Sequence, residues 1–192
     1  MVQGYLVSDP YPALLIPAGN EEAPAEATVR IHLVGGGKKG ADISDWHNQF
    51  VKLSGTLIER DQQSMLELVA GSIETANLPG PAPSSSTLAL GQQTLVGEIV
   101  DSKCHLGVMK PGEGEAHRAC AIRCISGGLP PMLVSRDTDG NARYMLLTNA
   151  EGEVFDDELL PKIGRAVRIT GMVYQRDDTL FMRAATDAIV RL

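Results

Sequence analysis

The sequence predicts an all-β protein made of two tandem small Greek-key barrels, the second of which carries a helical insertion bearing Cys and His. Three observations support this fold class. Short runs of alternating apolar and polar residues, bounded by Gly, Asp and Asn, recur along the chain, as half-buried β-strands require. A linker-like stretch divides the chain into halves of similar size, and the two halves resemble each other in sequence.

The domain boundaries follow from composition. The chain has 192 residues, 43% of them hydrophobic, which is enough to bury the core of one large or two small domains. The stretch "TANLPGPAPSSSTLALGQQT", residues 75–94, carries no charge and is rich in Pro, Ser and small residues, which is typical of a linker. We therefore expect a first, structural barrel over residues 1–76, a linker over 77–93 and a second barrel over 94–192.

The strands expected in each half match in order. "VKLSGTLIERD" (51–61) aligns without a gap on "VRITGMVYQRD" (167–177), and an apolar run follows each, so both predict a hairpin that turns at Arg-Asp. Upstream, "RIHLV" (30–34) matches "RYMLL" (143–147), and "GYLVSD" (4–9) matches "GEIVDS" (97–102). This common order predicts a tandem repeat.

A short helix-like piece precedes the last hairpin of each half, "ISDWHNQ" in the first and "DDELLPKIG" in the second. Strands in this order with a helix in this place resemble the OB-fold, a small five-stranded Greek-key barrel. A pair of small β-sandwiches is the alternative architecture.

The two halves differ in one place. The segment from Ser102 to Arg143 is longer than its counterpart from Asp9 to Arg30, so the second half carries an insertion over residues 102–131. All three cysteines lie in it. Because the first half has no cysteine, a barrel of this type does not need them to fold. We therefore expect the insertion to be the functional part of the chain.

A helix of about three turns is expected in "GEAHRACAIRCISGG" (114–128), ended by the glycines and by the prolines that follow. It places His117, Cys120 and Cys124 at positions i, i+3 and i+7, on one face. Cys104, with His105 beside it, follows a predicted strand and can approach the same face after the loop "MKPGEGE" turns the chain.

Three thiols and one imidazole that converge suit a soft or borderline cation. Cys104, His117, Cys120 and Cys124 are therefore the predicted metal ligands, for zinc in a closed tetrahedral site or for copper(I) with Met109 as a further ligand. His105 is the other reserve candidate. The spacing contains no Cys-x-x-Cys pair, so it matches no standard zinc finger or ribbon.

Three other interpretations of the cysteines stay open. Cys120 and Cys124 can be small core residues that seat the helix on the barrel. Cys104 can form a disulfide with a helix cysteine and staple the insertion, which would make the protein a structural interaction domain. A cysteine can act as a nucleophile with His117 as base, its pKa lowered by Lys103 or by the arginines of the helix. We expect a binding module rather than an enzyme.

Composition and charge exclude other classes. A net charge of −7 and an aromatic content of 4% argue against binding to nucleic acid. No apolar run approaches the roughly 18 residues that span a bilayer, and the start "MVQGYLVSDPYP" lacks the basic and apolar regions of a signal peptide. The glycine-rich "VGGGKKGAD" (34–42) lacks the spacing of a phosphate-binding P-loop, so we expect a loop that connects strands.

The segment "KCHLGVMKPGEGEAHRACAIRCISGGLPP" (103–131) resembles a segment of uncharacterised bacterial proteins with OB-like domains that are exported or membrane-anchored. The resemblance implies a periplasmic or extracytoplasmic location, and a protein partner in a membrane-associated complex for redox chemistry or metal handling. The chain is also broadly similar to small periplasmic OB-fold carriers that bind copper through Met, His and an aromatic residue. Met109 with His105 or His117 would fill those roles, although such carriers lack this cysteine cluster.

Overall fold

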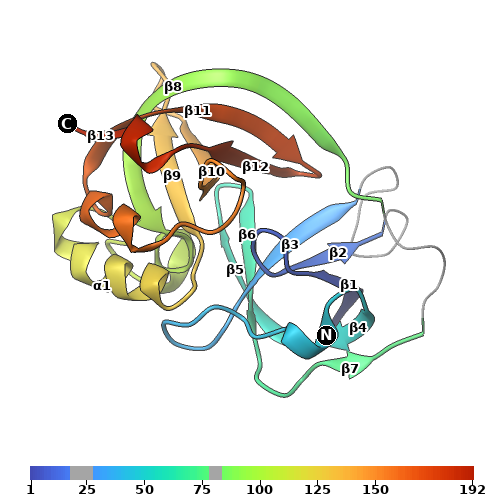
Figure 1. The fold of residues 1–192 in the computed structure, drawn as a ribbon. Helices are drawn as coiled ribbons and strands as arrows, with labels where there is room; N and C mark the ends of the chain where they lie inside the picture. The colour runs from blue at the N-terminus through green and yellow to red at the C-terminus, as the bar shows by residue number, and fades with distance from the viewer. Residues whose placement is uncertain (18–27, 78–83) are drawn as a thin grey trace.

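The computed structural model describes residues 1–17, 28–77 and 84–192, and most of its regular structure is β-strand (Figure 1). The first half contains β1 (Val2–Val7), β2 (Ala13–Ile16), β3 (Val29–Val34), the 3-10 turn η1 (Ser44–Trp46), β4 (Phe50–Leu53), β5 (Gly55–Arg60), β6 (Gln63–Leu68) and β7 (Glu74–Thr75). The second half contains β8 (Thr87–Asp101), the irregular turn η2 (Cys104–Val108), α1 (Glu115–Ser126), β9 (Pro131–Arg136), β10 (Ala142–Thr148), η3 (Asp157–Lys162), β11 (Ala166–Arg176), β12 (Thr179–Arg183), η4 (Thr186–Ala188) and β13 (Ile189–Arg191). The prediction of a mostly β protein is confirmed.

Both halves pair their strands in the same order. In the first half β1, β2 and β3 form an antiparallel meander, β3 runs parallel to β6, β6 pairs with β5, and β4 pairs with β1. In the second half β8, β9 and β10 form the meander, β10 runs parallel to β12, and β11 pairs with both β12 and β8. The last pairing closes a five-stranded barrel.

The predicted hairpins turn where the sequence places them. Arg60 faces Gln63 across the first turn, and Arg176 faces Thr179 across the second. Asp61 has a φ of 49° and Asp177 a φ of 55°, the left-handed conformation that tight hairpin turns require and that Asp tolerates better than most residues.

The strands differ from the sequence prediction in three ways. β8 begins at Thr87, so residues 87–93, which we expected in the linker, form a strand paired with β11. The run expected over residues 51–61 is divided into β4 and β5, and the short strands β7 and β13 were not predicted. β2 and β9 were not predicted either. All four residues of β2 and the first five of β9 are buried, so these strands lack the polar alternation that reveals a half-buried strand.

The insertion connects β8 to β9, where the first half has only the short link from β1 to β2. Helix α1 occupies residues 115–126, as predicted, and lies beside the second barrel (Figure 1). No helix within residues 1–17, 28–77 and 84–192 is long and apolar enough to cross a bilayer.

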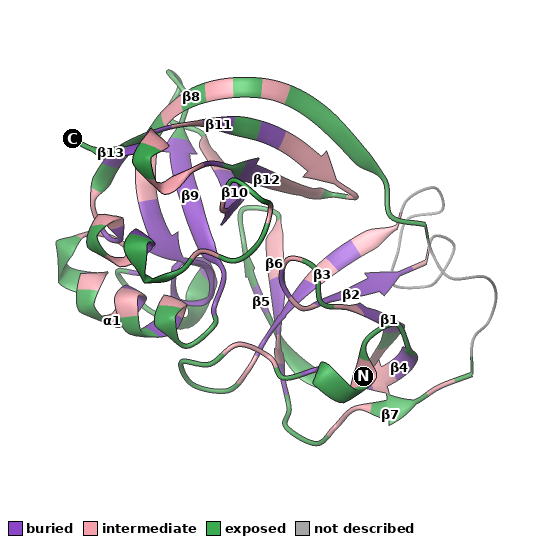
Figure 2. Ribbon diagram, viewed as in Figure 1, coloured by how far each residue is buried: buried purple, intermediate pink, exposed green. Residues whose placement is uncertain are grey.

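Apolar side chains form three buried clusters. One fills the first half and one fills the barrel of the second half. The third lies between the halves and includes Tyr11 and Met65 from the first together with Cys104, Cys124 and Phe181 from the second. Figure 2 shows buried residues along the facing strands of both halves. The interface between the halves therefore has a hydrophobic core of its own, in addition to the core of each half.

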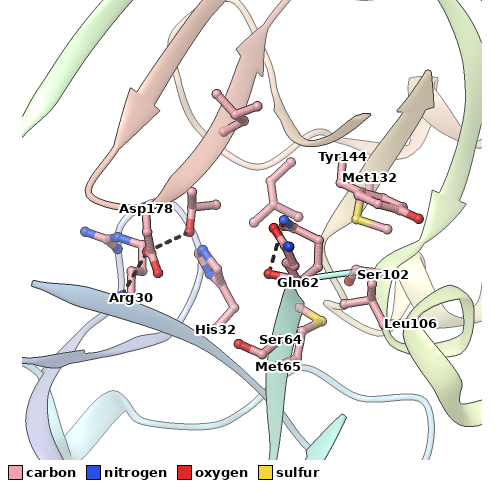
Figure 3. A pocket seen from close by; sticks show the side chains of 14 residues that line it. Arg30, His32, Gln62, Ser64, Met65, Ser102, Leu106, Met132, Tyr144 and Asp178 are labelled. Atoms are coloured by element: carbon pink, nitrogen blue, oxygen red, sulfur yellow. Dashed lines mark hydrogen bonds between the residues drawn. The ribbon is translucent and has the colours of Figure 1, made fainter. Parts of the chain in front are cut away.

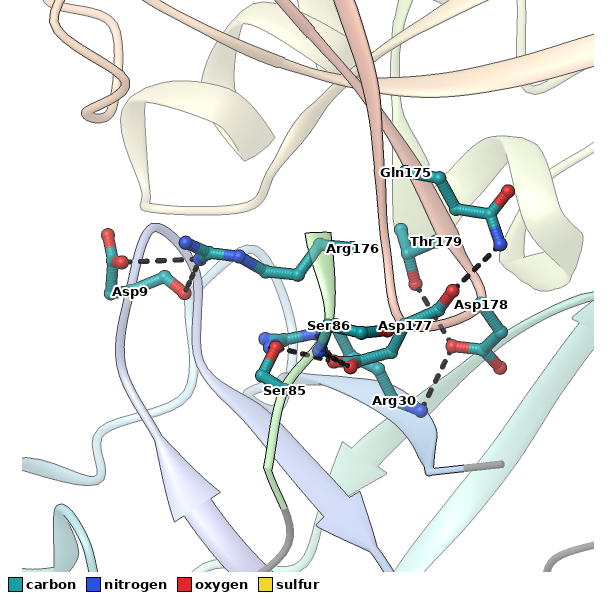
Figure 4. Close-up of polar contacts among 9 residues, drawn as sticks. All are labelled: Asp9, Arg30, Ser85, Ser86, Gln175, Arg176, Asp177, Asp178 and Thr179. Atoms are coloured by element: carbon teal, nitrogen blue, oxygen red, sulfur yellow. Dashed lines mark hydrogen bonds and ion pairs between the residues drawn. The ribbon is translucent and has the colours of Figure 1, made fainter. Parts of the chain in front are cut away.

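A buried ionic contact also joins the halves at the β11–β12 turn (Figure 4). The guanidinium Nε of Arg30 lies 3.0 Å from Oδ2 of Asp177, and these side chains are 2% and 1% exposed. The backbone N–H of Arg30 donates to Asp178 at 3.0 Å. Asp177 also accepts hydrogen bonds from Ser85 Oγ and from the backbone N–H of Ser86. The β11–β12 turn is thus bound by Arg30 of the first half and by Ser85 and Ser86, which precede β8.

Candidate metal centre

Helix α1 presents His117 and Cys124 to the interior and leaves Cys120 partly exposed. The helix ends as predicted, since Gly127 N–H bonds to the carbonyls of Arg123 and Cys124 and Gly128 takes a left-handed φ of 96°, a conformation in which glycine carries no steric penalty. The 3.6-residue period therefore brings all three predicted ligands of the helix to the side that faces the barrel.

Asp101 connects the helix to the turn that carries Cys104. It is the last residue of β8 and is fully buried. Its Oδ1 accepts the backbone N–H of Cys104 at 2.8 Å, and its Oδ2 lies 3.0 Å from Nε2 of His117. Sequence reasoning missed this residue, although an aspartate closing the apolar strand "GEIVD" was a visible signal.

The candidate ligand atoms converge in two overlapping groups. Those of Cys104, His117 and Cys120 lie within 4.8 Å of one another, and so do those of Asp101, Cys104 and Cys124. Cys104 belongs to both groups. The expectation that the predicted ligands lie close enough to hold a metal ion is therefore confirmed, with Asp101 as an additional member of the cluster.

The thiols of the cluster sit in a setting that disfavours their charged form. Burial, followed by the charge of Asp101, raises the pKa of the Cys104 thiol well above its usual range. The same two causes raise the pKa of Cys124 to about 11. A bound cation reverses this preference because it stabilises thiolates directly.

The expectation that Lys103 lowers a thiol pKa is wrong. The Lys103 ammonium points into the first half, where it donates to the carbonyls of Gly35 and Gly37 at 2.8 and 2.9 Å and lies 3.2 Å from a carboxylate oxygen of Glu67. Its charge is thus used to hold a loop.

The first half also supplies a side chain to the cluster. Lys38 lies in the loop between β3 and β4, and its Nζ is 2.8 Å from Sγ of Cys120. We expected this loop only to connect strands and the first barrel only to be structural. No local pattern could reveal the contact, because it joins residues far apart in the sequence.

The reserve ligands lie elsewhere. His105 and Met109 line a separate surface cavity together with Arg60 and Glu113. His105 is 1% exposed, and its Nδ1 lies 3.4 Å from a carboxylate oxygen of Glu113. His105 does not belong to the convergent groups of the described residues.

The structure also bears on the other interpretations of the cysteines. All three cysteines are unpaired. Cys104 and Cys124 belong to the apolar cluster between the halves, and Cys120 packs against it. These residues therefore contribute to the core whether or not an ion is bound.

A second polar feature lies at the interface, a cavity of about 40 Å³ lined by Arg30, His32, Ser64, Ser102 and Tyr144 among others (Figure 3). His32 is 3% exposed, and neither of its ring nitrogens has a hydrogen-bond partner among the described residues. A volume of this size suits a buried water rather than an organic ligand.

No family model, curated protein or solved structure matches the chain.

Proposed function

We propose that this protein is a metal-binding module that holds one zinc or copper(I) ion through Cys104, His117, Cys120 and Cys124. The convergence of three thiols and one imidazole around Cys104 is the observation that carries the proposal. Such a set matches the tetrahedral Cys₃His sites of zinc, and its soft sulfur donors also suit copper(I).

Asp101 supports the proposal because it supplies what metal-bound histidines usually have. A ligating imidazole commonly gives its second ring nitrogen to a carboxylate, which fixes the orientation of the ring and strengthens it as a donor. The contact between Asp101 and Nε2 of His117 leaves Nδ1 for the ion. By this reasoning Asp101 orients His117 rather than binding the ion itself.

We further propose that the two halves are tandem OB-like barrels. The support is their common pairing order, with β3 parallel to β6 in the first half and β10 parallel to β12 in the second. The short helical turns η1 and η3 also lie between the third and fourth strands of each half. The first barrel lacks the insertion and the cysteines, so the metal centre is a specialisation of the second.

A periplasmic or extracytoplasmic location, and a role as an accessory part of a membrane-associated redox or metal-handling complex, complete the proposal. Both rest on the resemblance of residues 103–131 to segments of exported bacterial proteins. Testing them requires localisation and co-purification from the native host.

A thiol enzyme is the second candidate function. Asp101, His117 and a nearby thiol repeat the order of orienting acid, base and nucleophile found in cysteine hydrolases. The raised pKa values of Cys104 and Cys124 oppose this role for two of the thiols and leave Cys120 as the candidate nucleophile.

Metal analysis of the purified chain, combined with a thiol count under denaturing, non-reducing conditions, separates the candidates. Stoichiometric metal with three reactive thiols supports the metal centre, whereas one thiol without metal supports a disulfide-stapled interaction domain. Three thiols with no metal, either as purified or after titration with zinc and copper(I), would contradict the proposal. Rapid modification of Cys120 by an electrophile in that metal-free protein would then favour the enzyme.

Variants test the ligand set. Cys124→Ser and His117→Gln should lose metal, while Met109→Leu, in the neighbouring cavity, should retain it. Unchanged binding by Cys124→Ser would show that the ligands are assigned wrongly.

A further inference from the structure

A loop of the first half packs directly against the helix that carries the metal ligands. The backbone N–H of Gly40 donates to the carbonyl of Gly127 at 2.8 Å. A Cβ added to Gly127 would lie 1.9 Å from the carbonyl oxygen of Lys38, and one added to Gly40 would lie 2.7 Å from that of Gly128. Glycines on both sides are thus required for the loop, residues 35–40, to approach the end of α1 this closely.

The same loop is held at a second point beside the metal centre. Lys103 is 2% exposed and precedes Cys104 in the chain. Its ammonium binds two carbonyls of the loop, those of Gly35 and Gly37. The loop is therefore fixed on one side to the end of the helix and on the other to the turn that carries the first ligand.

Lys38 lies between these two anchors. Of the four proposed ligands, Cys104, His117 and Cys124 are at most 5% exposed, and only Cys120 is not buried. The Lys38 ammonium, 2.8 Å from Cys120 Sγ, lies against that solvent-accessible ligand. The loop thus covers the side of the cluster from which solvent or a competing ligand can approach.

We propose that residues 35–40 are a lid on the metal centre and that Lys38 is a positioning residue that slows metal release. The inference rests on the proposed metal-binding function. Three thiolates around zinc or copper(I) leave a net negative charge, with the buried Asp101 carboxylate beside them. An ammonium that donates to the exposed sulfur offsets part of that charge and competes with incoming acids or metals for the sulfur lone pair.

The magnitude follows from the behaviour of other groups that contact metal ligands. Loss of such a partner typically weakens metal sites by about 10- to 100-fold. Lys38 is exposed, and solvent screens its charge, so the lower end applies. We expect Lys38→Ala to release zinc about 10-fold faster than the unsubstituted chain.

The test uses the full chain loaded with zinc and, in parallel, with cobalt(II). Transfer of zinc to an excess of a chromogenic chelator gives the release rate, and the cobalt–thiolate charge-transfer band reports directly on the sulfur ligands. Lys38→Ala should speed transfer and shift the band, and Lys38→Arg should restore both. Lys39→Ala is the matched control, because Lys39 lies in the same loop and its side chain makes no hydrogen bond to any described residue.

The outcomes separate the two proposals. If the unsubstituted chain binds zinc but Lys38→Ala releases it at the same rate with an unchanged cobalt band, the lid inference is overturned while the metal centre stands. Equal acceleration by Lys39→Ala also overturns the inference, because it would show a general effect of loop charge. If the unsubstituted chain takes up none of zinc, cobalt(II) and copper(I), the metal centre itself fails.

Discussion

Removing the Asp177 carboxylate should strongly destabilise the protein, because it leaves Arg30 charged inside the interface between the halves. Both side chains are at most 2% exposed, and burial is the leading cause that lowers the pKa of Arg30, opposed by the charge of Asp177. Breaking a buried ion pair from one side typically costs about 3–5 kcal/mol. Asp177→Ala also removes the acceptor for Ser85 and Ser86, so we expect a loss near the upper end of this range.

Urea denaturation of the full chain, followed by the fluorescence of Trp46 and by circular dichroism, measures this loss as a change in the free energy of unfolding. The matched control is Glu115→Ala, which removes the partner of Arg165 from an ion pair whose side chains are 38% and 66% exposed. Exposed pairs contribute roughly 0–1 kcal/mol. A cost for Asp177→Ala no larger than that of the control would refute the reasoning.

Three further predictions follow from other contacts. Burial, with Arg30 nearby, lowers the pKa of His32 to about 3. Between roughly pH 6.5 and 4.5 the His32 side chain therefore takes up a proton in the unfolded chain but not in the folded chain, and the free energy of unfolding should fall by roughly 2–3 kcal/mol. In denaturation measured against pH, this part of the loss should disappear in His32→Gln and remain in His47→Gln, because His47 is exposed. Gly127→Ala should destabilise the chain by about 2 kcal/mol through its clash with the carbonyl of Lys38, whereas Gly36→Ala, where an added Cβ has no neighbour closer than 3.9 Å, should change thermal stability little. Tyr11→Phe should cost about 1–2 kcal/mol in the same denaturation assay, because it leaves the buried carbonyl of Leu147 without the donor it has at 2.5 Å.

Local periodicity was enough to predict much of the fold. The runs that became β3 and β11 lie within one residue of the bounds expected from the sequence. In β11 buried residues alternate with more exposed ones over most of the strand, which is the pattern that a sequence reveals. β2 and β9 were not predicted because burial on both faces removes the alternation of apolar and polar residues. The start of β8 was assigned to the linker for two reasons. Its composition resembles that of the neighbouring linker, and apolar residues such as Leu88 and Leu90 are exposed, to 60% and 39%.

The candidate site shows the same division between local and distant information. The helical period alone predicted that His117, Cys120 and Cys124 share a face. Asp101 belongs to the site because it is the last residue of β8 and therefore lies beside the turn that carries Cys104. A prediction of the exact end of this strand could have revealed it. Lys38 reaches Cys120 only through the packing of the two halves, and a single sequence contains no pattern for such a contact.

The placement of Cys104 and Cys124 in the core between the halves has a thermodynamic consequence. All four proposed ligands belong to the second half, and the first half reaches them through Lys38, whose Nζ lies 2.8 Å from Cys120 Sγ. If that contact strengthens metal binding, linkage requires a bound ion to strengthen the association of the halves by the same factor. A variant that weakens the interface far from the cysteines, such as Asp177→Ala, would then lower metal affinity by no more than the part that Lys38 contributes, and only in molecules whose halves have separated.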